Sequence, residues 1–339
     1  MFNQKVVFIV GAGASREYNF PLGSDLKEAI ASGVRFRFEH GGSYLTGGSQ
    51  ELLDHIRRHV KGDVKKANEY TRAANALAGA IPSFVSIDEA LHYVSDSPEA
   101  VEVGKIAIVD QILKAERGSS LAFDQRTGRP GHLPDGWIAE LFSMALAQTQ
   151  RKDLKSIFSH ASFINFNYDR AIEQFIYFAL QERASATPDE AREIVENLNM
   201  LRPYGSIGRF VPNYGDQFAF GTTAHFDPFS RLQTLGTYTD QKPMHDLAAA
   251  STALAQAKLI IILGFGYHPT NVDVIKVTTG NCGAQVIGSV LGIHGTNHSL
   301  IASHIGKNLN MSANGIELHS MKASELLQEF RPRILRLLQ

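Results

Sequence analysis

The residue pattern predicts a buried β-strand close to the amino terminus. In the segment of residues 5–10, every residue after Lys5 is apolar. A nearly continuous apolar run is typical of a strand that is covered on both faces. The segment from Gly11 to Ser15 then turns the chain, and a helix is expected to follow, with a second helical start near Ser24. The chain therefore begins with a predicted strand, a glycine turn and a helix.

From about residue 49 to residue 147, apolar residues recur at helical spacing. Ile87, Leu91 and Val94 are spaced i, i+4, i+7 behind Ser86, an N-cap residue, and Glu89 is placed to complete a capping box. Residues 116–135 are rich in Gly, Arg and Pro and predict a loop within this stretch. We expect a helical insertion here rather than further β-α-β units.

Strand-like runs return after the helical stretch and are again separated by helical patterns. Strands are expected at residues 161–165, 259–263, 286–293 and 316–319. Helices are expected at residues 169–180, 187–198, 244–257 and 324–338, and residues 200–229 predict a loop with short strands. This alternation predicts an α/β fold with a doubly wound, mostly parallel, Rossmann-like sheet. The expected division is an α/β domain of residues 1–48 and 158–339 and an inserted helical lobe of residues 49–157.

Composition and charge narrow the classes of function. Thirty-three Lys and Arg residues face 34 Asp and Glu residues, for a net charge of −1, so no direct nucleic-acid binding is expected. The single cysteine, Cys282, can build neither a disulfide framework nor a cysteine-rich zinc site. We therefore expect no metal and a reducing, cytoplasmic location. No run approaches the ~18 apolar residues of a membrane span, so no membrane anchor is expected.

The glycine turn after the first strand has the features of a phosphate site. Glycines let the backbone approach a pyrophosphate, and the following helix offers free N–H groups and the positive end of its dipole. A tight turn without a ligand is the alternative. The dinucleotide fingerprint is incomplete, because Arg16 stands at the third glycine position and no acidic residue ends a second strand soon afterwards. The candidate binding residues of this turn are Gly11, Ala12, Gly13, Ala14 and Ser15.

A polar segment, Asn-Phe-Asn-Tyr-Asp at residues 165–169, follows the second predicted strand. Ligands of open α/β sheets bind outside the carboxyl ends of the strands. Two amides and a carboxylate in that place can orient a water molecule and bind a carboxamide or a ribose. The alternative is a plain helix start, because Asn167 and Asp169 are both good N-cap residues.

Two further loops at strand ends contain glycine and a titratable ring. Residues 263–271 follow the most strand-like run of the chain and contain Gly264, Gly266 and His268. Residues 202–208 read Arg-Pro-Tyr-Gly-Ser-Ile-Gly and contain Tyr204. Taken alone, His268 is a structural or exposed histidine and Tyr204 is a packed turn residue.

Taken in order, these segments resemble the sirtuin-like family of NAD-consuming proteins, most strongly its bacterial branch that lacks the zinc module. The carrying features are Gly-Ala-Gly-Ala-Ser followed by Pro21, Asn-Tyr-Asp at residues 167–169, the Gly-Ser pair after Tyr204, and a strand that ends in Gly-x-Gly at Gly266. The resemblance covers about residues 5–292. It implies a glycohydrolase that cleaves its substrate NAD to nicotinamide and ADP-ribose, and a role in antiphage defence through NAD depletion.

The expected roles of individual residues follow from the glycine turns and from this resemblance. The backbone of residues 11–15 is expected to hold the NAD pyrophosphate, with Gly264 and Gly266 on the adenosine side. Asp169 would bind the nicotinamide carboxamide, and Asn167 would orient the attacking water. Unrestrained NAD hydrolysis kills the host, so control by homo-oligomerisation or by a partner such as a hexameric ATPase is expected.

Tyr204 departs from the family pattern, which has a histidine general base in this place. A neutral tyrosine, with an ordinary pKa near ~10, is a poor base at pH 7. Three alternatives remain: Tyr204 only hydrogen-bonds the ribose, another group such as His268 or, less favoured, His225 supplies the base, or the chemistry is lost. The last alternative corresponds to a non-catalytic NAD or ADP-ribose binding module that acts as a sensor or scaffold. A protein deacylase is less favoured, because the zinc-binding Cys quartet is absent.

Overall fold

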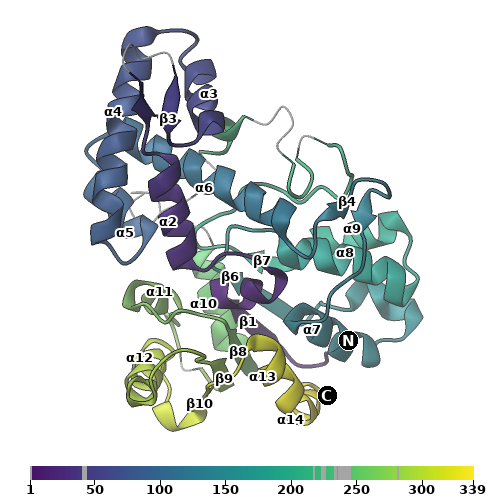
Figure 1. Cartoon of the computed structure of the whole chain (residues 1–339). Coiled ribbons are helices and arrows are strands. Elements are labelled where there is room, and N and C mark those ends of the chain that lie inside the picture. The colour runs from purple at the N-terminus through teal and green to yellow at the C-terminus, as the bar shows by residue number, and fades with distance from the viewer. Residues whose placement is uncertain are drawn as a thin grey trace. The chain divides into compact units, whose positions relative to one another are not determined.

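The chain forms two compact units in the computed structural model (Figure 1). The described residues are 2–39, 44–216, 218–222, 227–232, 235, 246–280 and 282–339. The first unit, here called the α/β unit, comprises Met1–Phe20, Ser119–Pro203 and His245–Gln339. The second, here called the helical unit, comprises Pro21–Gly118 and Tyr204–Met244.

A parallel sheet of six strands forms the centre of the α/β unit. Its spatial order is β10-β9-β8-β1-β6-β7, and every neighbouring pair is parallel. Numbered by their order along the chain, the strands therefore lie as 6-5-4-1-2-3, the order of a Rossmann-like sheet. The strands are β1 Val6–Val10, β6 Ala161–Asn165, β7 Asn199–Leu201, β8 Leu259–Leu263, β9 Gln285–Ser289 and β10 Ile316–His319.

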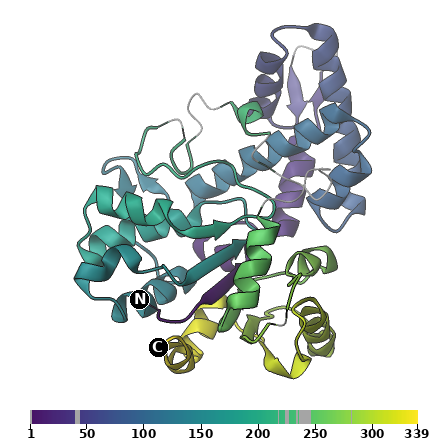
Figure 2. The same ribbon diagram turned by 180° about the vertical axis from the view of Figure 1, so that it is seen from behind.

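The core of this unit lies around β1 and β8, which are buried at all five positions of each strand. Both strands have neighbours on either side, and helices cover both faces of the sheet. The helices α13 (Ala323–Glu329) and α14 (Arg331–Leu338) pack on β9 and β8 and lie in front of the sheet in Figure 1. The helix α10 (Leu247–Gln256) lies in front when the sheet is seen from behind in Figure 2. Burial on both faces explains the uninterrupted apolar runs in the sequence.

Most predicted elements of the α/β unit are present. The helix expected at residues 169–180 is α8 (Ala171–Ala184), and α9 (Pro188–Glu196) begins with the expected Thr187 cap. The single last helix predicted at residues 324–338 is wrong. Pro332 lies in the first turn of α14, where its missing N–H needs no partner, and the chain bends at Phe330 between α13 and α14.

The helical unit contains five helices in its described residues, α2 to α6, and a short hairpin. The helix α6 is the longest and is packed by α2, α3, α4 and α5. Ser86 caps α5 as expected, because its Oγ accepts the Glu89 N–H. The elements are α2 Gly23–Gly33, β2 Arg37–Phe38, β3 Leu45–Gly47, α3 Gln50–His59, α4 Val64–Ala80, α5 Ile87–Tyr93 and α6 Pro98–Gly118.

The bounds of the two units differ from the expected ones, which set an inserted helical lobe at residues 49–157. The helix α2 belongs to the helical unit because its neighbours are α4 and α6, and α7 (Trp137–Ala147) belongs to the α/β unit because it packs on α8 and α13. Residues 119–203 of the α/β unit also hold a small hairpin within the expected loop. The remaining elements are β4 Phe123–Asp124, β5 Arg129–Pro130, α1 Ala12–Ser15, α11 Pro269–Val274, α12 His298–Asn308, and the 3-10 turns Arg16–Tyr18, Ile81–Ser83, Arg151–Ser156, Pro228–Arg231, Gly295–Asn297 and Ala313–Gly315.

No helix within the described ranges is both long and apolar enough to cross a lipid bilayer.

Candidate functional site

The strand order reverses direction at the carboxyl ends of β1 and β8. From β1 the chain adds β6 and β7 on one side and then returns to add β8, β9 and β10 on the other. In open α/β sheets, this reversal point is where ligands bind. Three predicted segments follow the strands that meet here: residues 11–15 after β1, 165–169 after β6 and 264–271 after β8.

The glycines of two of these segments are in direct contact with each other. Gly11 donates its N–H to the Leu263 carbonyl (3.0 Å), and Gly13 donates to the Gly264 carbonyl (2.8 Å). A Cβ atom on Gly13 would lie 2.8 Å from the Gly264 oxygen, and one on Gly264 would lie 1.9 Å from the Ala14 nitrogen. Gly264 also has a φ of +56°. These glycines are therefore required by the close approach of two loops, whether or not a ligand binds.

These internal hydrogen bonds reduce the number of backbone N–H groups that the turn can offer to a phosphate. The N–H groups of Gly11 and Gly13 are used as described, and the Ala14 N–H donates to the Gly11 carbonyl (3.0 Å). The helix α1 has only four residues, so its dipole is small. Among the described residues, nothing accepts a hydrogen bond from the Ala12 N–H. That group is the donor of this turn that remains for an anion.

A hydrogen-bonded cluster of Ser15, Asn167 and Asp169 lies behind the glycine turn, and all three side chains are buried. Asn167 donates from Nδ2 to the Gly11 carbonyl (3.1 Å) and to Ser15 Oγ (2.9 Å). Ser15 Oγ donates to Asp169 Oδ2 (3.0 Å), and Asp169 Oδ1 accepts the Ala171 N–H (3.0 Å). We refer to these three side chains as the Ser15 cluster.

The hydrogen bonds fix the orientation of the Asn167 amide. The Gly11 carbonyl can only accept, so the atom of Asn167 that faces it must be the NH2 group. Both amide protons are then in use, and Oδ1 takes part in no hydrogen bond with the described part of the chain. Asn167 can therefore act on a ligand or a water molecule only as an acceptor, through Oδ1.

Arg202 holds the main chain of the polar segment in place. Its Nη1 donates to the carbonyls of Asn167 (2.8 Å) and Asp169 (3.0 Å), and its Nη2 donates to Glu173 Oε1 (2.6 Å). The Arg202 and Glu173 side chains are only 10% and 13% exposed. Arg202, held by Glu173, therefore positions Asn167 and Asp169 through their backbone carbonyls.

Aromatic rings and a serine organise the loop after β8. Phe265 packs edge-to-face on Phe166 (4.8 Å between ring centroids) and on Tyr267 (5.3 Å). Ser289, at the end of β9, accepts the Gly264 N–H at its Oγ (2.8 Å), and its carbonyl accepts the Tyr267 hydroxyl (3.1 Å). Burial raises the pKa of the Tyr267 hydroxyl far above its ordinary value. Tyr267 is therefore a neutral structural donor and not a base.

The other predicted site residues lie in different surroundings. Gly266 is exposed, and a Cβ atom placed on it would meet nothing within 4 Å. His268 is half-buried and precedes α11, where its carbonyl accepts the N–H groups of Asn271 and Val272. Tyr204 belongs to the helical unit and is buried there, so its role at the Ser15 cluster stays a prediction. His225 lies outside the described residues.

Sequence reasoning did not assign roles to Arg202, Glu173 or Ser289. Arg202 lies in the predicted loop that contains Tyr204, and the residue pattern indicated a role only for the tyrosine. Its partner Glu173 is 29 residues away in the sequence. The sequence contained one signal for Arg202. Arginines are often placed at helix ends, where they interact with the helix dipole, but Arg202 directly precedes Pro203 at the end of a strand. Ser289 has no such signal, since a serine at the end of a strand is common.

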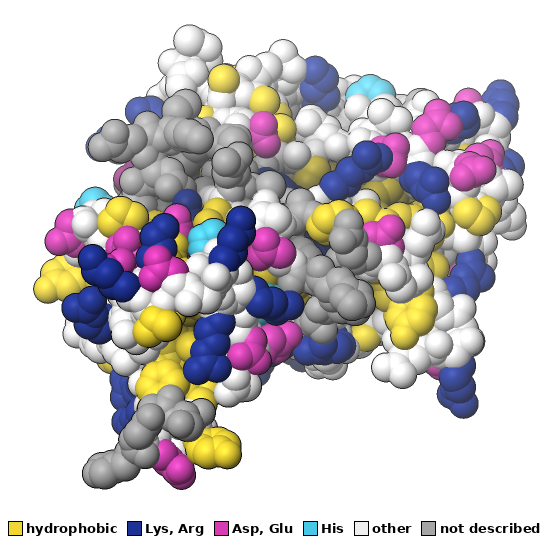
Figure 3. All heavy atoms as spheres, turned by 90° about the horizontal axis from the view of Figure 1, so that it is seen from above, with side chains coloured by type: hydrophobic (Ala, Val, Ile, Leu, Met, Phe, Trp, Pro, Cys, Tyr) yellow, Lys and Arg dark blue, Asp and Glu magenta, His cyan; other side chains and the backbone are white. Residues whose placement is uncertain are grey.

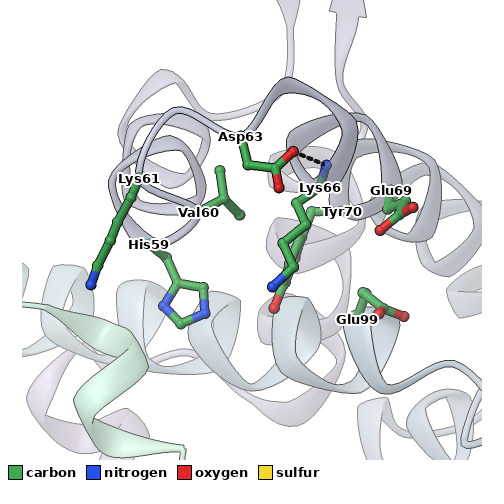
Figure 4. Close-up of a pocket in the computed structure, with 8 residues that line it drawn as sticks. All are labelled: His59, Val60, Lys61, Asp63, Lys66, Glu69, Tyr70 and Glu99. Atoms are coloured by element: carbon green, nitrogen blue, oxygen red, sulfur yellow. Dashed lines mark hydrogen bonds between the residues drawn. The ribbon is translucent and has the colours of Figure 1, made fainter.

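A pocket of about 370 Å³ in the helical unit is lined by charges of both signs, so its lining favours neither an anion nor a cation (Figure 4). Lys61 and Lys66 contribute positive charge, and the carboxylates Asp63, Glu69 and Glu99 contribute negative charge. Asp63 accepts the Lys66 N–H at the start of α4, as the dashed line in Figure 4 marks. The described residues contain no group of three or more His, Cys, Asp or Glu side chains placed to hold a metal ion.

An aromatic cluster forms one wall of this pocket. The His59 ring stacks on Phe229 (3.8 Å between centroids, 4° between planes), and Tyr70 meets both rings edge-on. Burial and a hydrogen bond to Glu102 raise the pKa of the Tyr70 hydroxyl. These interactions are typical of a packed core edge.

Charges of both signs are interspersed on the face drawn in Figure 3. Lys and Arg side chains lie next to Asp and Glu side chains there, as the near-neutral composition leads us to expect.

We expect Gly264→Ala to destabilise the fold and Gly266→Ala to leave its stability nearly unchanged. Gly264→Ala should lower the free energy of unfolding by about 2–4 kcal/mol, because the new methyl group collides with the α1 backbone in a left-handed conformation. Gly266→Ala should change it by less than about 0.5 kcal/mol, because the space around it is open. Urea denaturation of both variants measures the difference, and equal losses would contradict this account of the glycine turn.

No protein-family model matches this chain, and no curated protein matches it significantly. The fold therefore rests on the strand order and packing described above, and the function on the geometry of the site.

Proposed function

We propose that this protein is an NAD glycohydrolase of the sirtuin-like type, which splits NAD and water into nicotinamide and ADP-ribose. The Ser15 cluster carries the proposal. It places a neutral amide acceptor and a carboxylate, both held by defined hydrogen bonds, at the reversal point of a Rossmann-like sheet. The order of the motifs along the chain, and the resemblance that it carries, supports NAD as the ligand.

The chemistry needs little acid or base strength from the protein. Cleavage of the nicotinamide–ribose bond passes through an oxocarbenium-like ribose, as in glycoside hydrolysis. Nicotinamide leaves with the bonding electron pair, water adds to the ribose carbon, and the water loses one proton to solvent or to a nearby base. Asn167 Oδ1 would accept a hydrogen bond from that water and direct its oxygen toward the cation.

Asp169 would bind the amide N–H of the leaving nicotinamide. The hydrogen bonds from Ser15 Oγ and from the Ala171 N–H hold both carboxylate oxygens in a fixed direction. Phe166 and Phe265, which pack edge-to-face on each other, belong to the same two loops and would contribute apolar atoms near a flat pyridine ring. Ala12 contributes the N–H group that remains for the pyrophosphate.

Gly266→Leu tests where NAD binds. The open space at Gly266 allows a folded variant, whereas a side chain at Gly13 would meet the Gly264 backbone and disturb the fold itself. If the adenosine side of NAD lies over Gly266, the variant should lose NAD affinity at least about tenfold, because a leucine occupies the same volume. Calorimetry measures the affinity.

The matched control is Gly283→Leu. Gly283 is also exposed with nothing near its Cβ position, but it precedes β9 and so lies at the amino ends of the strands. Its leucine variant should bind NAD like the parent protein. An unchanged affinity in Gly266→Leu would remove the loop after β8 from the proposed site.

Tyr204 decides between an enzyme and a sensor. If Tyr204 only holds a ribose hydroxyl, Tyr204→Phe should slow nicotinamide release by the equivalent of about 1–3 kcal/mol, which is the cost of one lost polar contact. If His268 is the displaced base, His268→Ala should cause the larger loss. Chromatographic detection of nicotinamide follows both. Tight NAD binding by the parent protein without nicotinamide release under any condition tried would favour a non-catalytic NAD or ADP-ribose binding module.

The biological role that we propose is antiphage defence through NAD depletion. Such an activity needs restraint, so homo-oligomerisation or a partner such as a hexameric ATPase is expected to control it. NAD turnover with and without the products of neighbouring genes tests this part of the proposal.

A further inference from the structure

Two arginines of the helical unit lie on one side of the chain segment between α2 and β2. Val34 and Phe36 are buried in the unit, whereas Arg35 and Arg37, which alternate with them, are exposed. Both arginines line the same open pocket of about 400 Å³. The remaining lining residues are Ala31, Ser32, Thr46, Gly47 and Gly48.

This pocket differs in charge from the pocket beside His59. Among the described residues that line it, the charged groups are the two guanidinium groups, and the other polar side chains are the hydroxyls of Ser32 and Thr46. No carboxylate of the described part of the chain lines it, whereas three carboxylates and two lysines line the other pocket. The pocket therefore combines positive charge with neutral hydrogen-bonding groups, a combination that suits an anion.

The guanidinium groups keep most of their donors. Arg35 Nη2 donates to the Ala78 carbonyl (3.1 Å) near the end of α4, and Arg37 makes neither a hydrogen bond nor an ion pair with its side chain in the described ranges. A guanidinium has five N–H donors. By contrast, Arg202, Arg331 and Arg333 each meet a carboxylate. Arg35 and Arg37 have no such partner among the described residues.

Gly47 and Gly48 let the segment that contains the arginines pack closely against β3. A Cβ on Gly47 would lie 3.3 Å from Arg37 Cδ, so the arginine side chain lies across the bare backbone of β3. Gly48 has a φ of +91°, and its Cβ would lie 2.7 Å from the Phe36 ring. The two glycines are therefore required by the close approach of this segment to β3, and both arginines stay exposed.

We propose that this pocket, here called the arginine pocket, binds the phosphate or pyrophosphate group of a small phosphorylated ligand. The planar fork of a guanidinium matches two phosphate oxygens, and two such forks with adjacent hydroxyls suit a doubly charged anion. The site lies within the helical unit and uses none of the residues of the proposed NAD site. It therefore gives the helical unit a ligand of its own, independent of whether the Ser15 cluster cleaves NAD.

Calorimetry with inorganic pyrophosphate at low salt tests the proposal. The full chain should bind it, and Arg35→Gln/Arg37→Gln should bind it at least about tenfold more weakly, because charge-assisted hydrogen bonds are lost. The control is Arg57→Gln/Arg72→Gln, which removes the same charge from α3 and α4. Arg57 lies 3.8 Å from Asp54, and Arg72 donates only to the Asn68 carbonyl. This control should retain the affinity of the parent protein.

The single variant Arg37→Gln keeps the proposal testable if the double variant misfolds. Arg35 also supports the end of α4, so the double variant can lose stability, whereas the Arg37 side chain holds no described residue by a hydrogen bond. Arg37→Gln alone should weaken pyrophosphate binding severalfold in a protein of parental melting temperature. Absence of binding by the parent protein, or equal losses in the control and in the arginine-pocket variants, would overturn the proposal.

Two further arms separate this site from the NAD site and identify the ligand class. Gly266→Leu, which is expected to weaken NAD binding at the loop after β8, should leave pyrophosphate binding at the arginine pocket intact; loss of that binding would place the anion elsewhere and overturn the proposal. ATP and ribose 5-phosphate, titrated in the same way, distinguish a nucleotide from a sugar phosphate. Binding of a short DNA duplex without binding of any of these small ligands would overturn the choice of a small ligand.

Discussion

Asn167→Ala should lower the rate of nicotinamide release by roughly 10²–10⁴-fold, the usual cost of removing an orienting or charge-stabilising polar group. The structure specifies why. Both Asn167 protons are held by the Gly11 carbonyl and Ser15 Oγ, so Oδ1 has a fixed direction and can only accept. An alanine removes that acceptor, and water then attacks the ribose cation without guidance. Single-turnover measurements with saturating NAD isolate the chemical step from binding.

The same substitution also costs stability, so it needs a matched control. Ser15 Oγ loses a buried donor, which should lower the free energy of unfolding by about 1–2 kcal/mol. Asn199→Ala breaks a hydrogen bond between the same atom types, from Nδ2 to Ser162 Oγ (2.8 Å), but an exposed one near the amino ends of β6 and β7. It should leave turnover unchanged. A folded Asn167→Ala variant with parental turnover would remove Asn167 from the mechanism.

Arg202→Ala should be among the most destabilising substitutions of a polar residue in the α/β unit, at about 3–5 kcal/mol. Removal of one partner of a buried ion pair leaves the other charge uncompensated, here the carboxylate of Glu173. The carbonyls of Asn167 and Asp169 also lose their donors. Chemical denaturation measures the loss. NAD turnover should fall as well, because the Ser15 cluster loses the support of its backbone.

An exposed arginine of the same unit provides the comparison. Arg126 lies 3.5 Å from Asp124, and its side chain is 89% exposed. Arg126→Ala should change stability by less than about 1 kcal/mol, because surface ion pairs are screened by solvent. Arg202→Lys should recover part of the stability through its charge but not both carbonyl contacts, since an ammonium lacks the planar fork. Equal costs for Arg202→Ala and Arg126→Ala would refute a supporting role for Arg202.

The sequence predicted the central strands well because their signal is local. Residues 6–10 and 259–263 are apolar at every position, residues 161–165 are apolar at three of five, and each segment is a largely buried strand of the parallel sheet. The α/β class followed from the helices between them. The strand β7 has only three residues, too few to show a periodic pattern, so the sequence predicts only a loop with short strands at residues 200–229, without their positions. The bend at Phe330 was missed because the apolar spacing continues across Pro332.

For the site, the sequence by itself determined which residue types stand at the ends of the strands: glycines, an asparagine, an aspartate and a histidine. Only the tertiary structure decided how they meet, because Gly11 and Asn167 are 156 residues apart and the order of the strands brings them together. It assigned Gly13 and Gly264 to the contact between two loops and directed the Asn167 amide. It also showed that Arg202, paired with Glu173, holds the backbone of the polar segment. Local patterns report on neighbours within a few residues, whereas each of these contacts depends on the arrangement of the whole sheet.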